Sequence, residues 1–141
     1  MISVTGQTFE YILQPILISM HRETRAWLSS ADLWKRELNF FQKILDNHSI
    51  TNPHEEFKKQ VDHFQHLITY YQGEVVDLFR KKLRNHEKKL AQILREKKES
   101  DTSYFTEHSG LMEEVQAFAQ TISGFKQDLF NFIERGYSPY K

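Results

Sequence analysis

The sequence predicts an all-α protein: an elongated, antiparallel up-down-up bundle of three long helices with coiled-coil-like packing. Three observations support this prediction. The 141 residues include only 5 Gly and 3 Pro, the residues that most often interrupt helices. Two short polar segments divide the sequence into three long stretches. Within each stretch, apolar residues alternate at spacings of four and three, the pattern of a buried helix face in a left-handed bundle.

The first helix is expected over roughly residues 8–48. Pro15 cannot donate a backbone hydrogen bond, so the helix either kinks or begins there. We favour a continuous helix, because the apolar stripe keeps its phase across Pro15. This stripe consists of Leu13, Leu17, Met20, Thr24, Trp27, Ala31, Trp34, Leu38, Phe41 and Leu45.

The second helix is expected over residues 53–99, which at 1.5 Å per residue gives about 69 Å. Asn52 can cap it, Pro53 suits its first position, and Glu55 can complete a capping box. Its stripe runs through Phe57, Val61, Phe64, Ile68, Tyr71, Val75 and Leu78. It then shifts by one residue and resumes at Phe79, Leu83, His86, Leu90 and Ile93. The shift near Leu78 predicts a local change in the supercoil.

The third helix is expected over residues 103–135, between a polar segment and the helix-ending pair Arg135-Gly136, with Pro139 beyond. Its stripe consists of Tyr104, His108, Leu111, Val115, Phe118, Ile122, Phe125, Leu129 and Phe132. The short connections require antiparallel neighbours. We expect one domain over residues 1–141.

Composition removes several classes of function. Without Cys there are no disulfides and no thiolate chemistry, and 19 basic residues balance 19 acidic ones. No nucleophile, P-loop or dinucleotide-binding motif is present, so nothing indicates an enzyme or a cofactor. The apolar stretch 11–20 is too short to span a bilayer, and the first residues do not resemble a signal peptide. We therefore expect a cytoplasmic protein.

A metal site is one alternative, because helical bundles of the ferritin-like and hemerythrin-like classes hold metals. His63 and His66 lie three residues apart and could share a metal with Glu37, Asp62 or Glu74. Both histidines occupy outward positions of the stripe pattern, and the Glu-x-x-His motif of di-iron bundles is missing. Solvent-exposed histidines are therefore the favoured interpretation.

Two histidines occupy core positions instead. His86 and His108 both lie near the second connection, so they could meet across the second and third helices. The favoured interpretation is a buried histidine that hydrogen-bonds a neighbour. The alternative is a pH-sensitive pair, because two facing imidazoles resist double protonation.

A basic run follows in the second helix. Between residues 80 and 98, nine basic residues stand against two acidic ones, whereas residues 101–134 carry six acids and one base. An antiparallel hairpin brings these segments together, so we expect much of the charge to be compensated within the fold. The alternative is a polyanion-binding helix; nucleic acid is a less favoured partner. The six bases considered for this patch are Arg80, Lys81, Arg84, Lys88, Lys89 and Arg95.

Four large side chains occupy positions that a three-helix bundle should leave polar: Leu33, Phe40, Tyr70 and Phe130. Ala26, Leu33 and Phe40 form a second stripe with a spacing of seven on the first helix. A second apolar face usually has a second helical neighbour. We therefore predict a protein–protein interaction or scaffolding module that forms a homodimer or binds a partner's helix.

Overall fold

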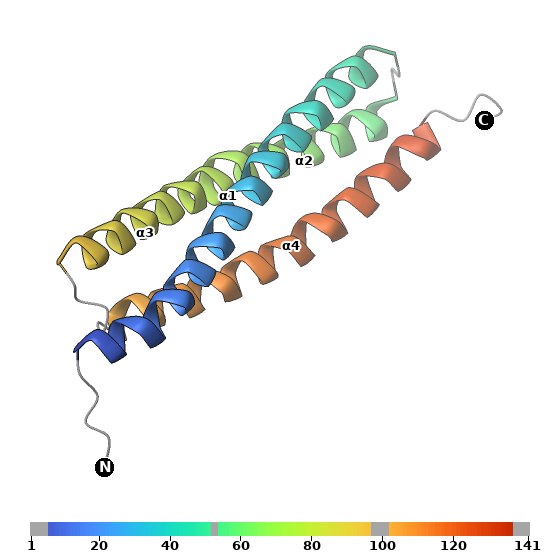
Figure 1. Cartoon of the computed structure of the whole chain (residues 1–141). Coiled ribbons are helices and arrows are strands. Elements are labelled where there is room, and N and C mark those ends of the chain that lie inside the picture. Colours follow the sequence, from blue (N-terminus) through green and yellow to red (C-terminus); the bar gives the residue numbers. More distant parts are fainter. Residues whose placement is uncertain (1–5, 52–53, 97–101, 137–141) are drawn as a thin grey trace.

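The computed structural model describes residues 6–51, 54–96 and 102–136, which form three helical rods (Figure 1). The first rod is α1 (Gly6–Thr51), and the third is α4 (Thr102–Gly136). The second combines α2 (Glu55–Tyr70), the π-helical segment η1 (Tyr71–Val76) and α3 (Asp77–Glu96). The described residues contain no strand, so the predicted all-α class is confirmed.

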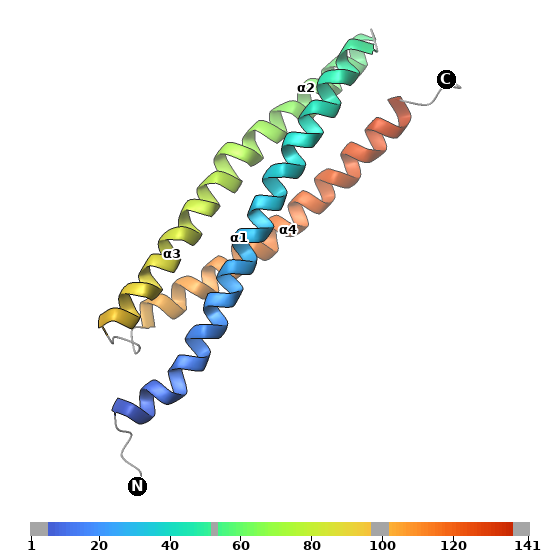
Figure 2. The same ribbon diagram turned by 45° about the horizontal axis from the view of Figure 1, so that its top comes forward.

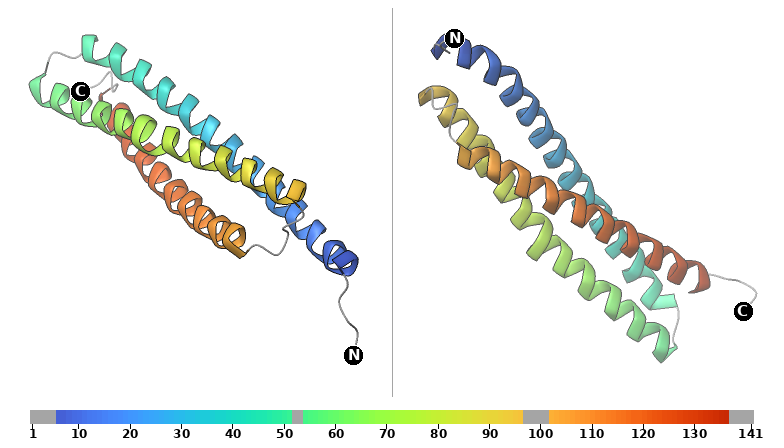
Figure 3. Two further views of the ribbon diagram at one scale, coloured as in Figure 1. Left: turned by 90° about the vertical axis from the view of Figure 1, so that its left-hand side faces the viewer. Right: turned by 90° about the horizontal axis from the view of Figure 1, so that it is seen from below.

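The rods lie lengthwise against one another in the predicted up-down-up order (Figures 2 and 3). At one end, the beginning of α1 meets the end of α3 and the start of α4. At the other end, the rings of Phe57 and Phe132 stack with centroids 4.9 Å apart, which joins α2 to the last turns of α4. The second rod therefore runs antiparallel to its two neighbours, and α1 runs parallel to α4.

Helix α1 is continuous through Pro15, as the unbroken stripe predicted. The missing N–H of proline removes one hydrogen bond from the helix, and the buried side chains that follow, from Leu17 onward, hold it against the bundle. Over residues 14–47, where the structure describes the side chains of α1, nine are buried. They keep the predicted spacing, except that Leu28 is buried in place of half-buried Trp27. They are Leu17, Met20, Thr24, Leu28, Ala31, Trp34, Leu38, Phe41 and Leu45.

The predicted one-residue shift is present, but it lies earlier than Leu78. In η1 the N–H of Asp77 donates to the carbonyl of Gln72, five residues back, so this wider turn holds one extra residue. The buried face therefore resumes at Val76, which is 1% exposed. Placing Leu78 in the stripe was wrong, because its side chain is 49% exposed once the extra residue has been absorbed.

The core consists of two apolar clusters separated by a polar layer. The larger cluster joins all three rods from Leu28 and Leu111 to the Phe57 end. The smaller cluster, at the opposite end, contains Leu17, Met20, Leu90, Ile93 and Tyr104. Between them lie Thr24, His86 and His108, one from each rod, with at most 3% of their surface exposed. We call these three residues the polar layer.

The end of α4 agrees with the sequence, and the start of α2 differs from it. Helix α4 ends at Gly136, where a Cβ atom would come within 2.6 Å of the Phe57 ring, so the absence of a side chain permits this contact. Helix α2 begins at Glu55, two residues after the predicted start. The predicted capping box is therefore wrong, because Glu55 stands at the first helical position and not at the third. The predicted cap at Asn52 and first position at Pro53 lie outside the described residues.

Two leucines of α1 test the assignment of buried and outward faces. Leu38 is fully buried and Leu33 is 55% exposed. We expect Leu38→Ala to lower the free energy of unfolding by about 2–5 kcal/mol, because it removes core contacts and leaves a cavity. Leu33→Ala should change it by less than about 0.5 kcal/mol. Urea denaturation followed by circular dichroism compares them, and equal losses would contradict the assignment.

A single-residue deletion tests the role of η1. Removing Gly73, which is exposed and has no side chain to lose, should convert η1 to ordinary α-helix and keep both parts of the stripe in phase. Removing exposed Asn85 from α3 should rotate all later residues by about 100° and turn His86 and Leu90 away from the core. We expect the deletion of Asn85, but not that of Gly73, to lower the free energy of unfolding by more than about 4 kcal/mol. Thermal denaturation distinguishes them, and equal destabilisation would exclude the proposed role of η1.

Candidate functional site

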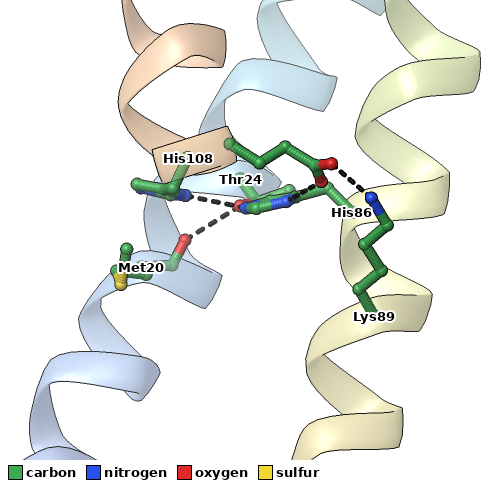
Figure 4. A network of polar contacts seen from close by, with 6 residues as sticks. Met20, Thr24, His86, Lys89 and His108 are labelled. Atoms are coloured by element: carbon green, nitrogen blue, oxygen red, sulfur yellow. Dashed lines mark hydrogen bonds and ion pairs between the residues drawn. The ribbon is translucent and has the colours of Figure 1, made fainter. Parts of the chain in front are cut away.

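The polar layer is built around a direct hydrogen bond between two buried imidazoles (Figure 4). His86 Nε2 on α3 lies 3.0 Å from His108 Nδ1 on α4. The prediction that these two residues meet across the second and third helices is confirmed. Thr24 completes the layer from α1, and its hydroxyl donates to the Met20 carbonyl at 2.9 Å, so its polar group is satisfied within its own helix.

A carboxylate stands at each end of the imidazole pair. His86 Nδ1 lies 2.6 Å from Glu107 Oε1, and Lys89 contacts the other oxygen of Glu107. At the far end, His108 Nε2 lies 3.6 Å from Glu23 Oε1 on α1, beyond hydrogen-bond reach. Among the described residues this buried nitrogen has no hydrogen-bond partner. We call Glu107, His86, His108 and Glu23 the histidine bridge.

Aromatic rings hold both imidazoles in place. The His86 ring is stacked on Tyr104 with centroids 4.2 Å apart and planes 1° from parallel. The His108 ring lies 4.6 Å from Trp27, tilted by 33°. The apolar stripes of the sequence predict the core positions of the two histidines but do not indicate their acidic partners. The sequence does contain an indication of Glu23. It lies four residues before Trp27, so both side chains are on the side of α1 that faces α4.

Burial controls the protonation of this site. Burial lowers the pKa of His86, although Glu107 acts to raise it. Burial also lowers the pKa of His108; the facing His86 lowers it further, and Glu23 acts to raise it. Burial also raises the pKa of Tyr104 to about 12. Although burial disfavours its charge, Lys89 and His86 hold the pKa of Glu107 below its usual value. At neutral pH the bridge therefore consists of neutral imidazoles and a charged Glu107.

Three of the four predicted interface residues lie on the outside of α1 and α4. Leu33 and Phe40 are 55% and 58% exposed on the outer face of α1, and Phe130 on α4 is 46% exposed. The Phe41 ring joins the two helices, since its centroid lies 6.2 Å from that of Phe40 and 5.6 Å from that of Phe130. We call Leu33, Phe40 and Phe130 the outer strip.

The fourth predicted interface residue belongs to another surface. Tyr70 lies on α2, where its ring contacts Tyr71 at 5.8 Å. It borders a groove of roughly 600 Å³ between α1 and α2 that is lined mostly by polar side chains, Gln42 and His66 among them. The structure therefore divides the predicted interface between two faces of the bundle.

The basic run is compensated in part. Lys82 lies 3.1 Å from Glu114, and Lys89 contacts Glu107, so the predicted pairing between the second and third helices is present. Arg80 instead turns to α1, where Asp32 lies 2.9 Å away.

The other bases of the predicted patch face outward: Lys81, Arg84, Lys88 and Arg95. They are exposed, and their spacing places them on a single face of α3. Within the described part of the chain, none of these four has a carboxylate at ion-pair distance. Polyanion binding by this face stays a prediction.

His63 and His66 are exposed, as the stripe pattern predicted. His66 Nδ1 lies 2.8 Å from the Asp62 carbonyl of the preceding turn, and the His63 ring lies against Phe64. In the described ranges, no three or more His, Asp or Glu side chains are grouped so that they could hold a metal ion. A metal site at these two histidines therefore stays a prediction without a third ligand.

No family model, curated protein or solved structure matches this sequence. Of the described helices, none combines the length and the apolar character that a membrane-spanning helix needs. The assignment of function therefore depends on the geometry of the histidine bridge, the outer strip and the basic face.

The lowered pKa values of the two histidines predict how stability depends on pH. An imidazole with an ordinary pKa of about 6.5 in the unfolded chain takes up a proton before the buried one does. The contribution of the two neutral histidines to the free energy of unfolding is therefore complete above about pH 6.5. It is lost as the pH falls toward their lower pKa values in the folded state. We expect the free energy of unfolding, measured with urea, to decrease from about pH 7 to about pH 5.

The double variant His86→Leu/His108→Leu is the control for this prediction. It removes both imidazoles at similar volume and leaves Glu107 paired with Lys89, so its stability should vary less with pH over the same range. An unchanged slope would show that other groups cause the pH dependence.

Proposed function

We propose that this protein is a non-enzymatic helical interaction module that self-associates through the outer strip. The supporting observation is the exposure of three large apolar side chains, Leu33, Phe40 and Phe130, on adjoining faces of α1 and α4. Helical bundles place polar residues on such faces unless another surface covers them.

The surroundings of the outer strip suit a second copy of the same chain. Arg36 and Lys43 are exposed within one turn of Phe40, and Glu134 is exposed one turn beyond Phe130. A two-fold axis along the helices would set the basic edge of one subunit against the acidic edge of the other. With a formal net charge of zero, two copies do not repel each other at long range.

The central ion pair of this region is compatible with burial. Lys126 Nζ lies 2.7 Å from Glu37 Oε2, and both side chains are already about three-quarters buried. Glu37 lies one turn from both Leu33 and Phe40, and Lys126 balances its charge at the centre of the strip. The other carboxylate oxygen, Glu37 Oε1, has no hydrogen-bond partner among the described residues.

The energetics favour a weak dimer. Full burial of a large apolar side chain contributes about 1.5–3 kcal/mol, and the side chains of the strip are already about half buried, so each can add roughly half of this. A symmetric contact buries the strip of both subunits. Loss of translational and rotational freedom opposes association by roughly 4–15 kcal/mol. The two contributions are similar in size, so the proportion of dimer should depend on concentration.

The double variant Leu33→Glu/Phe40→Glu tests this proposal. It places four charges in a symmetric interface, so it should stay monomeric at concentrations at which the wild type is dimeric. Light scattering coupled to size-exclusion chromatography measures the mass over a dilution series. The matched control is Ser29→Glu/Asn47→Glu, which adds two acids at exposed α1 positions and removes no apolar side chain.

Circular dichroism confirms that both variants are folded. If Leu33→Glu/Phe40→Glu elutes like the wild type at every concentration, the outer strip is not the interface. If the control also dissociates the dimer, added charge alone explains the effect.

A further inference from the structure

We propose that the histidine bridge is a binding site for a single proton, held between two buried imidazoles and flanked by carboxylates from α1 and α4. This inference is independent of the proposed self-association. It rests on the order of donors and acceptors along Glu107, His86, His108 and Glu23, and on one buried nitrogen that has no partner.

With no added proton, the tautomers are determined by the Glu107 end. A carboxylate only accepts, so His86 Nδ1 carries the hydrogen that it donates to Glu107 across 2.6 Å. Neutral His86 then has a lone pair at Nε2, and His108 Nδ1 must donate to it across 3.0 Å. Neutral His108 is left with a lone pair at Nε2 that faces another acceptor, the Glu23 carboxylate.

One added proton gives His108 Nε2 a partner once the Glu23 carboxylate, now 3.6 Å away, moves within hydrogen-bond distance. With a hydrogen on His108 Nε2, the imidazole can donate to Glu23 while its Nδ1 still donates to His86. The proton between the two rings can belong to either nitrogen without breaking a hydrogen bond. The buried positive charge is then flanked by Glu107 on one side and Glu23 on the other, and the Trp27 face lies 4.6 Å from the His108 ring.

A second added proton is excluded by the same geometry. If both imidazoles were cations, His86 Nε2 and His108 Nδ1 would each carry a hydrogen and would face each other across 3.0 Å. The contact would change from a hydrogen bond to a repulsion between two donors with like charges. The bridge therefore has room for one proton, whereas two separate histidines would take up two.

Other charged groups near the bridge do not replace these roles. From α3, Lys89 pairs with Glu107, and Glu87 pairs with Arg25 of α1 at 3.5 Å. From α4, Tyr104 stacks on His86 and keeps its phenolic proton, because burial raises its pKa to about 12.

Both ends of the bridge are open to solvent although the imidazoles are not. Glu107 lines a groove of roughly 550 Å³ between α3 and α4, and the Glu23 side chain is 39% exposed. A proton can therefore enter from either carboxylate without opening the core. Its uptake adds a charge-assisted hydrogen bond between α1 and α4, so all three rods become joined at the polar layer.

Imidazole nitrogen NMR of the full chain tests the proposal, since it reports tautomer and charge separately. Well above the ordinary imidazole pKa of about 6.5, His86 and His108 should both carry their hydrogen on Nδ1. On acidification the two rings should titrate together and take up one proton between them while the backbone spectrum stays that of the folded protein. A hydrogen on Nε2 of neutral His108, or two full protonation steps in the folded state, would overturn the proposal.

Glu23→Gln provides the second test. The amide can donate to the lone pair of neutral His108 and no longer balances its positive charge, so the proton affinity of the pair should fall about tenfold or more. The matched control is Glu114→Gln, which removes a carboxylate of α4 that pairs with Lys82 instead, and which should change this affinity by less than about twofold. Equal affinities in Glu23→Gln and wild type would exclude Glu23 from the site.

Discussion

The hydrogen bond between His86 and His108 constrains how the three rods are aligned. Apolar side chains pack against one another in many registers, but a buried polar atom needs its own partner. Sliding α4 along α3 by one turn would separate the two imidazoles and place His108 against a leucine, at a cost of about 1–3 kcal/mol for each unpaired polar group. The apolar clusters on both sides of the polar layer are therefore held in the alignment that this one bond requires.

The bond itself depends on the extra residue in η1. Ile68 and Val76 are buried eight residues apart, whereas an unbroken four-three stripe would bury residues seven apart. The wider π-helical turn absorbs this difference, so the second rod buries Ile68 before the turn and His86 after it. The π-helical turn η1, in the middle of the second rod, thus determines which side chains of α3 reach the polar layer.

The outer surface divides into faces with different chemistry. Bases that flank the contact between α3 and α4, such as Lys82 and Lys89, are matched by acids of α4, whereas the bases on the outer face of α3 have none in the described residues. The apolar outer strip lies between α1 and α4. A three-helix bundle by itself does not specify a function, so these faces and the histidine bridge carry the functional argument.

The sequence by itself determined the helices, because their periodicity, low Gly and Pro content and terminal signals all act over a few residues. It also placed His86 and His108 in the core and Leu33, Phe40 and Phe130 outside it. Only the tertiary structure decided that the shift lies at η1, that Leu78 is exposed, and that Tyr70 lies apart from the outer strip. It alone brought Glu23 and Glu107 to the two ends of the imidazole pair, since a stripe pattern gives the face of a side chain but not the neighbour that packing between distant segments sets against it.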